Sequence, residues 1–222
     1  ILEGSGATWM IGIASAAGVT ATLVGGVPAG TITARLGVWR ALLAHELAGA
    51  LTIALFALVL GLGREVILIP AVLVVSVLLG VIRPIRISGA TLASADIVSE
   101  RASLTTINGT VSSVQQIGLV LGQALGGIFI TAWGAHAVIW LDAATFVPGG
   151  LLFAVASART RPGRTQDAVA TSILAGAKSL LRDHVLRTYA VIAVLISTTL
   201  QTFLFYLPAV IADVGLDARW YG

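Results

Sequence analysis

The chain has 222 residues, of which 57% are hydrophobic and only 10% are charged, and its mean hydropathy is +0.99. A soluble domain carries about 25% charged residues, so this composition excludes an ordinary soluble protein and predicts an all-α membrane protein. The formal net charge of +3 is too small to indicate a nucleic-acid partner, and the absence of cysteine excludes disulfides and thiolate metal sites.

Six segments of the chain have the ~20 apolar residues that a membrane-spanning helix needs. In chain order, we expect the six spans of this polytopic helical bundle at Trp9–Thr33, Val38–Leu62, Val66–Ala93, Ser103–Ala132, Val138–Ala156 and Tyr189–Ala212. Small residues in a span let a neighbouring helix approach closely. The first span has such residues at four-residue spacing, namely Ala14, Gly18, Thr22, Gly26 and Gly30.

The connection between the first two spans sets their orientation. It carries Arg35 and Arg40, whereas residues 4–34 carry no charge at all. Short loops that are rich in Lys and Arg stay in the cytoplasm. This turn should therefore face the inside of the cell, and the direction of every other span follows from it.

The stretch after the fifth span differs from the rest. Residues 157–187 are more polar, and the spacing of apolar residues in Ala168–Arg187 predicts an amphipathic helix on the inner membrane surface. We therefore expect three parts: residues 1–156 form five spans of an N-terminal bundle, residues 157–187 form a cytoplasmic linker, and residues 188–222 begin a second, truncated bundle.

Charged residues inside apolar segments are candidates for function, because a charge in a bilayer is costly. Arg83 and Arg86 share one face of the third span, and Arg83 lies ~27 Å along the helix from Glu65, near the inner end of the bilayer core. They either extend to the inner headgroups or form a positive patch at the mouth of a cavity. Such a patch would favour an anionic cargo.

Two carboxylates are candidates for proton coupling. Glu46 lies well inside an apolar run on the cytoplasmic side, and we expect it either to pair with Arg35 or Arg40 or to carry a proton. Its neighbour His45 should point about 100° away around the helix. Asp142 is expected close to the outer end of the fifth span, where either the helix dipole stabilises it or it relays protons.

Uncharged polar residues within the spans should face the bundle interior, since each needs a partner there. Among them, Gln115 and Gln116 are our candidates for hydrogen bonds to cargo. The sequence has no P-loop, no H-E-x-x-H and no G-x-S-x-G motif. We therefore expect a protein that is not an enzyme and that has neither a metal site nor a cofactor.

The first inner turn resembles a motif of the major facilitator superfamily, G-x-L-A-D-R-x-G-R-R. Gly30, Arg35 and Gly37 match this gating motif, and Arg40 lies one position beyond its last basic residue. Ala34 stands where the family has an acidic residue. Because that acid is associated with locking the inner gate, the gate here should be weaker or held differently.

The fourth span is similar to the G-x-x-x-G-P-x-x-G-G pattern of the family's fifth helix, which is associated with antiporters. Its glycines are Gly118, Gly122, Gly126 and Gly127, and Gln123 replaces the usual proline. The resemblance therefore implies export by antiport. Because Gln123 replaces this proline, an importer or a facilitator remains an alternative.

Two further stretches are similar to the branch that holds enterobactin exporters and macrolide efflux proteins. They are Trp140–Phe146, at the sixth helix, and Gly176–Arg187, in the central loop. By this alignment the chain is a fragment that covers helices two to seven of twelve. The third span would then be the family's fourth helix, which lines the cavity and favours cargo binding by Arg83 and Arg86.

The resemblance as a whole implies a proton-coupled antiporter in the bacterial inner membrane. It would export a small amphipathic molecule, a drug or a siderophore-like compound, by alternating access and at the expense of the proton gradient. Its partners would be this cargo and the lipid bilayer, and the full-length protein would be monomeric. The alternatives are a nutrient importer or facilitator on the same fold, and a membrane remnant that does not transport.

Overall fold

The computed structural model describes residues 8–63, 65–97, 101–159, 181–189, 191–192 and 195–196. Four long helices dominate these ranges: α2 (Thr8–Leu36), α3 (Val38–Gly61), α4 (Glu65–Ile97) and α5 (Arg101–Arg159). Each is long and apolar enough to cross a membrane. The all-helical membrane fold is thus confirmed, and the first three spans begin and end within a few residues of their predicted limits.

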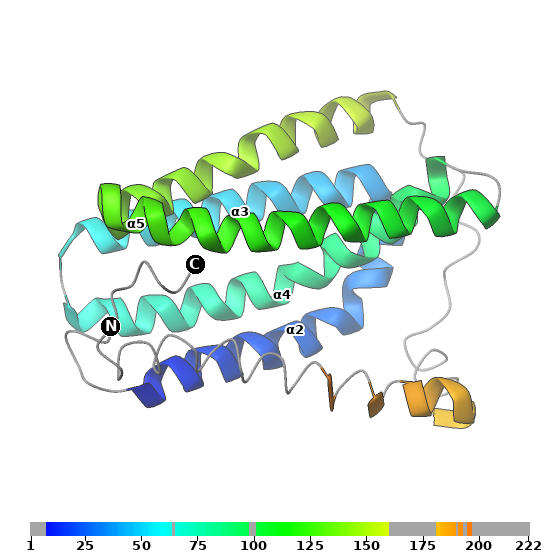
Figure 1. The fold of residues 1–222 in the computed structure, drawn as a ribbon, viewed down its shortest axis with the longest axis horizontal. Helices are drawn as coiled ribbons and strands as arrows, with labels where there is room; N and C mark the ends of the chain where they lie inside the picture. Colours follow the sequence, from blue (N-terminus) through cyan, green and yellow to red (C-terminus); the bar gives the residue numbers. More distant parts are fainter. Residues whose placement is uncertain are drawn as a thin grey trace.

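The helix α5 consists of two helices joined at Gly134. This residue has φ 79° and ψ 158°, a backbone region that essentially only glycine adopts. Figure 1 shows that the first arm, residues 101–133, and the second arm, residues 135–159, run antiparallel. Each arm exceeds the ~20 residues of a spanning helix, so the four helices supply five membrane-length segments.

The predicted fourth and fifth spans correspond to these two arms, with one difference. The sequence left residues 133–137 between the spans, whereas a single glycine makes the turn. The sixth predicted span, Tyr189–Ala212, lies almost entirely outside the described residues.

A second single-glycine turn joins α2 to α3. Gly37 has φ 82° and ψ 149°, and its carbonyl accepts a 2.9 Å hydrogen bond from the backbone N–H of Ala41, in the first turn of α3. Arg35 and Arg40 are exposed on either side of this turn. The alternating helix directions put Arg159 at the same end of the bundle (Figure 1), as the expected cytoplasmic orientation requires.

The helices do not pack simply in chain order. The helix α2 lies mainly against α4, and α3 lies against α4 and α5, with little contact between α2 and α3 (Figure 1). The close approach of α2 and α4 depends on small residues: a Cβ at Gly25 would overlap the Val81 carbonyl oxygen, and one at Gly80 would overlap that of Gly18.

The row of small residues by which α2 packs against α4, its small-residue seam, is therefore rotated around the helix from the row that the sequence predicted. Its members are buried or half-buried and follow one another at steps of four, three, four and four residues, namely Ala14, Gly18, Ala21, Gly25 and Ala29. A Cβ added at Gly26 or Gly30 would meet nothing within 4 Å. The predicted seam was wrong at these two positions because a strict four-residue spacing drifts around a helix with 3.6 residues per turn.

A hydrophobic cluster joins the ends of α3, α4 and α5 near the arginine-bearing turn. Val38, Leu42 and Ala93 are its buried core. The rings of Trp39 and Phe153 pack at its edge, with 6.5 Å between their centroids. This cluster holds one end of the three helices together and fixes how their middle sections face one another.

The described part of the predicted linker contains a helix break. Asp183 is not helical, and its Oδ1 accepts hydrogen bonds from the backbone N–H groups of Val185, at 2.8 Å, and Leu186, at 3.2 Å. Such an N-cap starts a new helix, here residues 184–189. The prediction of one continuous amphipathic helix over Ala168–Arg187 was therefore wrong at Asp183.

The remaining part of the linker lies outside the described residues, as does most of the stretch that we assign to a second bundle. The boundaries predicted for the three parts of the chain stay predictions. What the structure describes in depth is the set of five antiparallel segments from Thr8 to Arg159.

Candidate functional site

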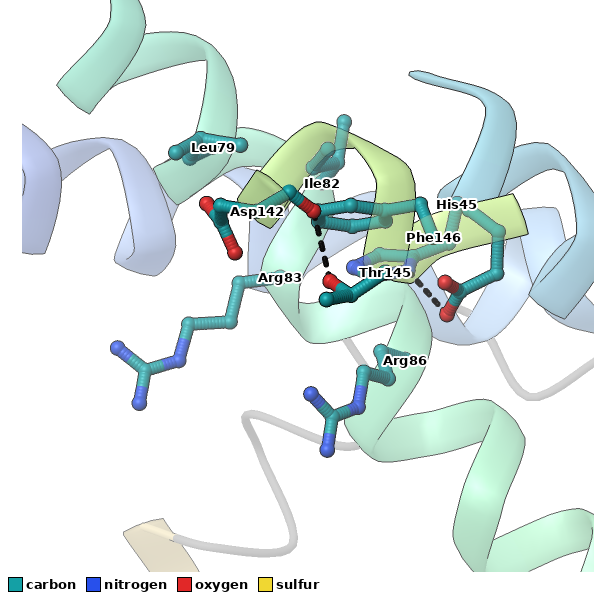
Figure 2. Close-up of a pocket in the computed structure, with 9 residues that line it drawn as sticks. His45, Leu79, Ile82, Arg83, Arg86, Asp142, Thr145 and Phe146 are labelled. Atoms are coloured by element: carbon teal, nitrogen blue, oxygen red, sulfur yellow. Dashed lines mark hydrogen bonds and ion pairs between the residues drawn. The ribbon is translucent and has the colours of Figure 1, made fainter. Parts of the chain in front are cut away.

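An open cleft of about 520 Å³ lies between α3, α4 and the second arm of α5 (Figure 2). Its lining residues are His45, Glu46, Leu79, Ile82, Arg83, Arg86, Asp142, Thr145 and Phe146. Four of them are the charged residues that the sequence singled out: Glu46, Arg83, Arg86 and Asp142. The fold thus gathers from three helices the charges that the sequence placed on three separate spans.

Glu46 pairs with its neighbour on α3. The Nδ1 atom of His45 lies 3.3 Å from Oε1 of Glu46, and the two side chains are only 9% and 14% exposed. The predicted ion pair with Arg35 or Arg40 does not form, because both arginines lie exposed at the end of the bundle. The expected divergence of His45 and Glu46 was also wrong, since their side chains bend toward each other.

Two glycines bring α3 and the second arm close together at this point. A Cβ added at Gly149 would lie 3.0 Å from Oε2 of Glu46, and one added at Gly49 would overlap the ring of Phe146. The Glu46 carboxylate therefore occupies space that any larger residue at position 149 would take. It is held between its histidine partner and the backbone of the second arm.

Arg83 and Arg86 are three residues apart on α4 and so share one helical face. Figure 2 shows both side chains extending in the same direction, away from the second arm. Both are exposed, and Pro84 between them is buried. Among the described residues, neither guanidinium group forms an ion pair or a hydrogen bond.

These arginines do not lie at the end of their helix. The helix α4 continues for 14 residues beyond Arg83, to Ile97, which is ~21 Å at 1.5 Å per residue. They face a cleft that also contains two carboxylates. Both predicted roles, a positive patch in a cavity and an extension to the headgroups, stay predictions, and only the first uses the cleft that the arginines line.

Asp142 lies farther inside its helix than expected. The second arm begins after Gly134, so Asp142 is its eighth residue, about two turns into the helix. The influence of the helix dipole falls off within the first turn, so this position lies beyond its strongest effect, and both predicted roles of Asp142 stay predictions. Its side chain is exposed to the cleft, on the side of Arg83 (Figure 2).

The family model of the Major Facilitator Superfamily matches residues 4–222. The chain belongs to this superfamily. Superfamily members are membrane transporters and not enzymes, so the protein is a multi-pass membrane transporter, and the charged cleft is its candidate transport site. No curated protein and no solved structure matches the chain, so the resemblance to enterobactin exporters and macrolide efflux proteins stays a prediction.

The superfamily's gating motif lies at the end of the bundle and not in the cleft. Gly37 makes the turn, and Arg35 and Arg40 are exposed beside it. Gly30 lies half-buried in α2 with open space where a Cβ would be. The gating role of these four residues stays a prediction.

The antiporter-like glycine pattern on the first arm of α5 lies on an open surface. Every residue from 108 to 123 on the first arm is exposed, including Gln115, Gln116 and Gln123. A Cβ at each of three of the glycines, Gly118, Gly122 and Gly126, would meet nothing within 4 Å, and the fourth, Gly127, is half-buried. The structure does not bring Gln115 and Gln116 to the cleft, and their cargo role stays a prediction.

Sequence reasoning missed three polar or aromatic residues that line the cleft: His45, Thr145 and Phe146. A signal for two of them was present, because Asp142, Thr145 and Phe146 follow one another at i, i+3 and i+4 and therefore share a helical face. The Thr145 hydroxyl donates a 2.7 Å hydrogen bond to the backbone carbonyl of Asp142. For His45, which adjoins Glu46, no such spacing signal exists.

Proposed function

We propose that the protein is a proton-coupled secondary transporter and that its transport site is the cleft between α3, α4 and the second arm of α5. The observation that carries this proposal is the convergence of Glu46, Arg83, Arg86 and Asp142, together with His45, on that cleft. Charges inside a span are costly. Their concentration in one place is expected of a site that handles charged solutes or protons.

The cleft has the parts that proton coupling needs. Glu46, Asp142 and His45 can each exchange a proton, whereas the arginines stay charged at any physiological pH. A proton that binds to a carboxylate changes the electrostatic field at the nearby guanidinium groups. Proton binding and cargo binding in the same cleft must therefore influence each other, and this influence is reciprocal.

For the direction of transport, the first candidate is antiport that exports a small amphipathic molecule from a bacterial cell, by alternating access across the inner membrane. The glycine pattern from Gly118 to Gly127 supports it by resemblance. In this proposal the proton gradient supplies the energy, no cofactor takes part, and a monomeric full-length protein contacts only cargo and lipid.

The second candidate is an importer or facilitator on the same fold. Gln123, which replaces the usual proline of the antiporter pattern, favours it. The two arginines of the cleft, which form no ion pair with any described residue, favour it as well. A remnant that does not transport has less support. It would leave no reason for five charged or titratable side chains to converge inside the membrane.

The experiment uses the full-length protein in everted membrane vesicles that hold a proton gradient, read by a pH-sensitive dye. Hydrophobic cations, macrolides and anionic catecholates are added in turn. We expect one class to change the gradient, and this response to be lost in Glu46→Gln or Asp142→Asn. Asp183→Asn is the matched control, because it removes a carboxylate outside the cleft and leaves an acceptable N-cap.

Antiport dissipates the gradient when cargo is added outside everted vesicles, because cargo enters as protons leave. Movement of cargo and protons in the same direction is read with cargo loaded inside the vesicles, because the two then leave together and dissipate the gradient. No response to any compound, whether added outside the vesicles or loaded inside them, from protein shown to be folded and inserted would contradict the proposal. A response that survives in both Glu46→Gln and Asp142→Asn would show that coupling lies outside this cleft.

A further inference from the structure

We infer that the cleft binds an amphipathic organic anion, with its carboxylate or phosphate group between Arg83 and Arg86, and that anion binding and proton binding in the cleft favour each other. This inference rests on the proposed function only in that it takes the cleft as the cargo site. It adds the chemical class of the cargo and the sign of its coupling to protons.

The first support is the unpaired state of the two arginines. Two arginine side chains extend in the same direction from one face of α4 (Figure 2), and within the described residues neither guanidinium group has an ion-pair or hydrogen-bond partner. A guanidinium group presents a planar fork of donors that matches a carboxylate or a phosphate. Charges inside a membrane protein normally pair, so an anionic group of the cargo would give the two arginines the partner that none of the described residues supplies.

The second support is that neither carboxylate of the cleft forms an ion pair with Arg83 or Arg86. Glu46 is held by His45 at 3.3 Å and by close packing against Gly149. Asp142 faces the cleft but lies more than 4.0 Å from both guanidinium groups, since no ion pair joins them. The arginines are thus left open to a group that enters from the cleft.

The third support is the apolar part of the lining. Leu79, Ile82 and Phe146 form the wall next to the charges. A ligand with a compact anionic group and an apolar body can satisfy both kinds of surface at once. A fully hydrated inorganic ion would gain little from the apolar wall, and a cation would be repelled by the two arginines.

The sign of the coupling follows from the charges that face the cleft. Among the described residues these are His45 and Glu46 from α3, Arg83 and Arg86 from α4, and Asp142 from α5. When both carboxylates are ionised, they offset the two arginines and repel an entering anion. When they are protonated, the arginines act unopposed.

Anion binding should therefore become tighter as the pH falls, and by reciprocity the bound anion should draw protons into the cleft. An anionic cargo would then move together with protons, which favours the second candidate direction. A hydrophobic cation would compete with protons and give the opposite sign, as antiport requires.

The test measures binding separately from transport. The full-length protein in lipid nanodiscs is titrated by calorimetry with benzoate and phenyl phosphate as anionic probes, with benzamide as the neutral analogue of benzoate and with benzylammonium as the cation. We expect the anionic probes to bind in preference to the other two. Their affinity should rise from mildly alkaline to mildly acidic pH, with uptake of protons that two buffers of different ionisation enthalpy reveal.

The variants locate the binding. Arg83→Gln and Arg86→Gln should each weaken benzoate binding by about tenfold or more, because each removes charge-assisted hydrogen bonds. Arg182→Gln, which removes an exposed arginine outside the cleft, should not. The double variant Glu46→Gln, Asp142→Asn should bind benzoate at alkaline pH nearly as tightly as the unaltered protein does at acidic pH. Thermal unfolding of each variant, and Arg83→Lys as a conservative change, separate loss of the site from loss of the fold.

Failure of both anionic probes to bind the folded protein would overturn the inference. So would preference for benzylammonium, equal affinity for benzoate and benzamide, or benzoate binding that neither arginine variant weakens. Proton coupling in vesicles without anion preference in nanodiscs would refute the inference and leave the proposed function standing. Anion binding in nanodiscs without any proton response in vesicles would do the reverse.

Discussion

Two adjacent glycines of α2 give a matched pair of variants that tests the packing of the bundle. A Cβ at Gly25 would overlap the carbonyl oxygen of Val81 and lie 2.8 Å from its Cα, whereas one at Gly26 would meet nothing within 4 Å. The obstruction at Gly25 is backbone, so no side-chain rotation relieves it. To bring 2.8 Å to an ordinary contact of 3.4 Å, α2 and α4 must separate by about 0.6 Å or more.

The magnitude follows from the difference between Gly25→Ala and Gly26→Ala. Both gain about 1 kcal/mol of helix propensity, which cancels in the comparison. Overpacking costs about 1–3 kcal/mol and applies to Gly25→Ala alone. We therefore expect the free energy of unfolding of Gly25→Ala to lie about 1–3 kcal/mol below that of Gly26→Ala.

The assay is reversible unfolding of the full-length protein in detergent micelles by sodium dodecyl sulfate, followed by circular dichroism. Equal stability of the two variants would refute the proposed register of α2 against α4. Greater destabilisation by Gly26→Ala would instead support the predicted packing face at strict four-residue spacing, which includes Gly26.

Three further changes probe the turns and the site. Gly37→Ala should lower the free energy of unfolding by about 1–3 kcal/mol, because φ 82° and ψ 149° suit only glycine; unchanged stability in the same unfolding assay would contradict this backbone. His136→Phe should cost about 0.5–1.5 kcal/mol, since it removes a 3.1 Å hydrogen bond to a carbonyl of α3; stability equal to that of the unaltered protein would show that the bond contributes nothing. Gly149→Ala should reduce the cargo-dependent proton response in vesicles, because the new Cβ would crowd the Glu46 carboxylate at 3.0 Å; a full response would mean that the position of Glu46 is not critical.

The length and order of the helices could be predicted because they depend on local properties. Runs of apolar residues identify spans, and the turn at Gly37 stands out through its two arginines. The turn at Gly134 was harder to locate, because Trp133, Ala135 and Ala137 around it are as apolar as the spans themselves. No break in polarity marks a turn that needs only one glycine.

The packing faces were less predictable because they depend on the partner helix. A step of four residues turns about 40° beyond a full helical turn, so a seam from Ala14 to Gly30 at that spacing winds away from its neighbour. The observed seam mixes steps of three and four and stays on one face. Sequence alone did not reveal that this neighbour is α4 and not α3.

The sequence identified the charged residues of the candidate site, but it did not show that they converge on one cleft. Each of Glu46, Arg83, Arg86 and Asp142 stood out alone, as a charge inside an apolar run. Their convergence depends on how α3, α4 and the second arm of α5 pack together, which no single helix encodes. For the same reason Gln115 and Gln116, chosen by polarity alone, lie on the exposed first arm.

The proposal that the cleft is the transport site is tested most directly by asking whether cargo occupies it. The 222 residues contain no cysteine, so a single cysteine can report on one position, provided that any cysteine elsewhere in the full-length protein is replaced. Thr145→Cys places the thiol in the cleft, and Thr131→Cys places it on an exposed part of α5 that does not line the cleft.

The measurement is the rate of alkylation by a maleimide, with and without the compound that changes the proton gradient in vesicles. We expect this compound to slow the alkylation of Thr145→Cys and to leave that of Thr131→Cys unchanged. Equal rates with and without the compound at Thr145→Cys, in protein that still transports it, would contradict the assignment of the cleft as the transport site.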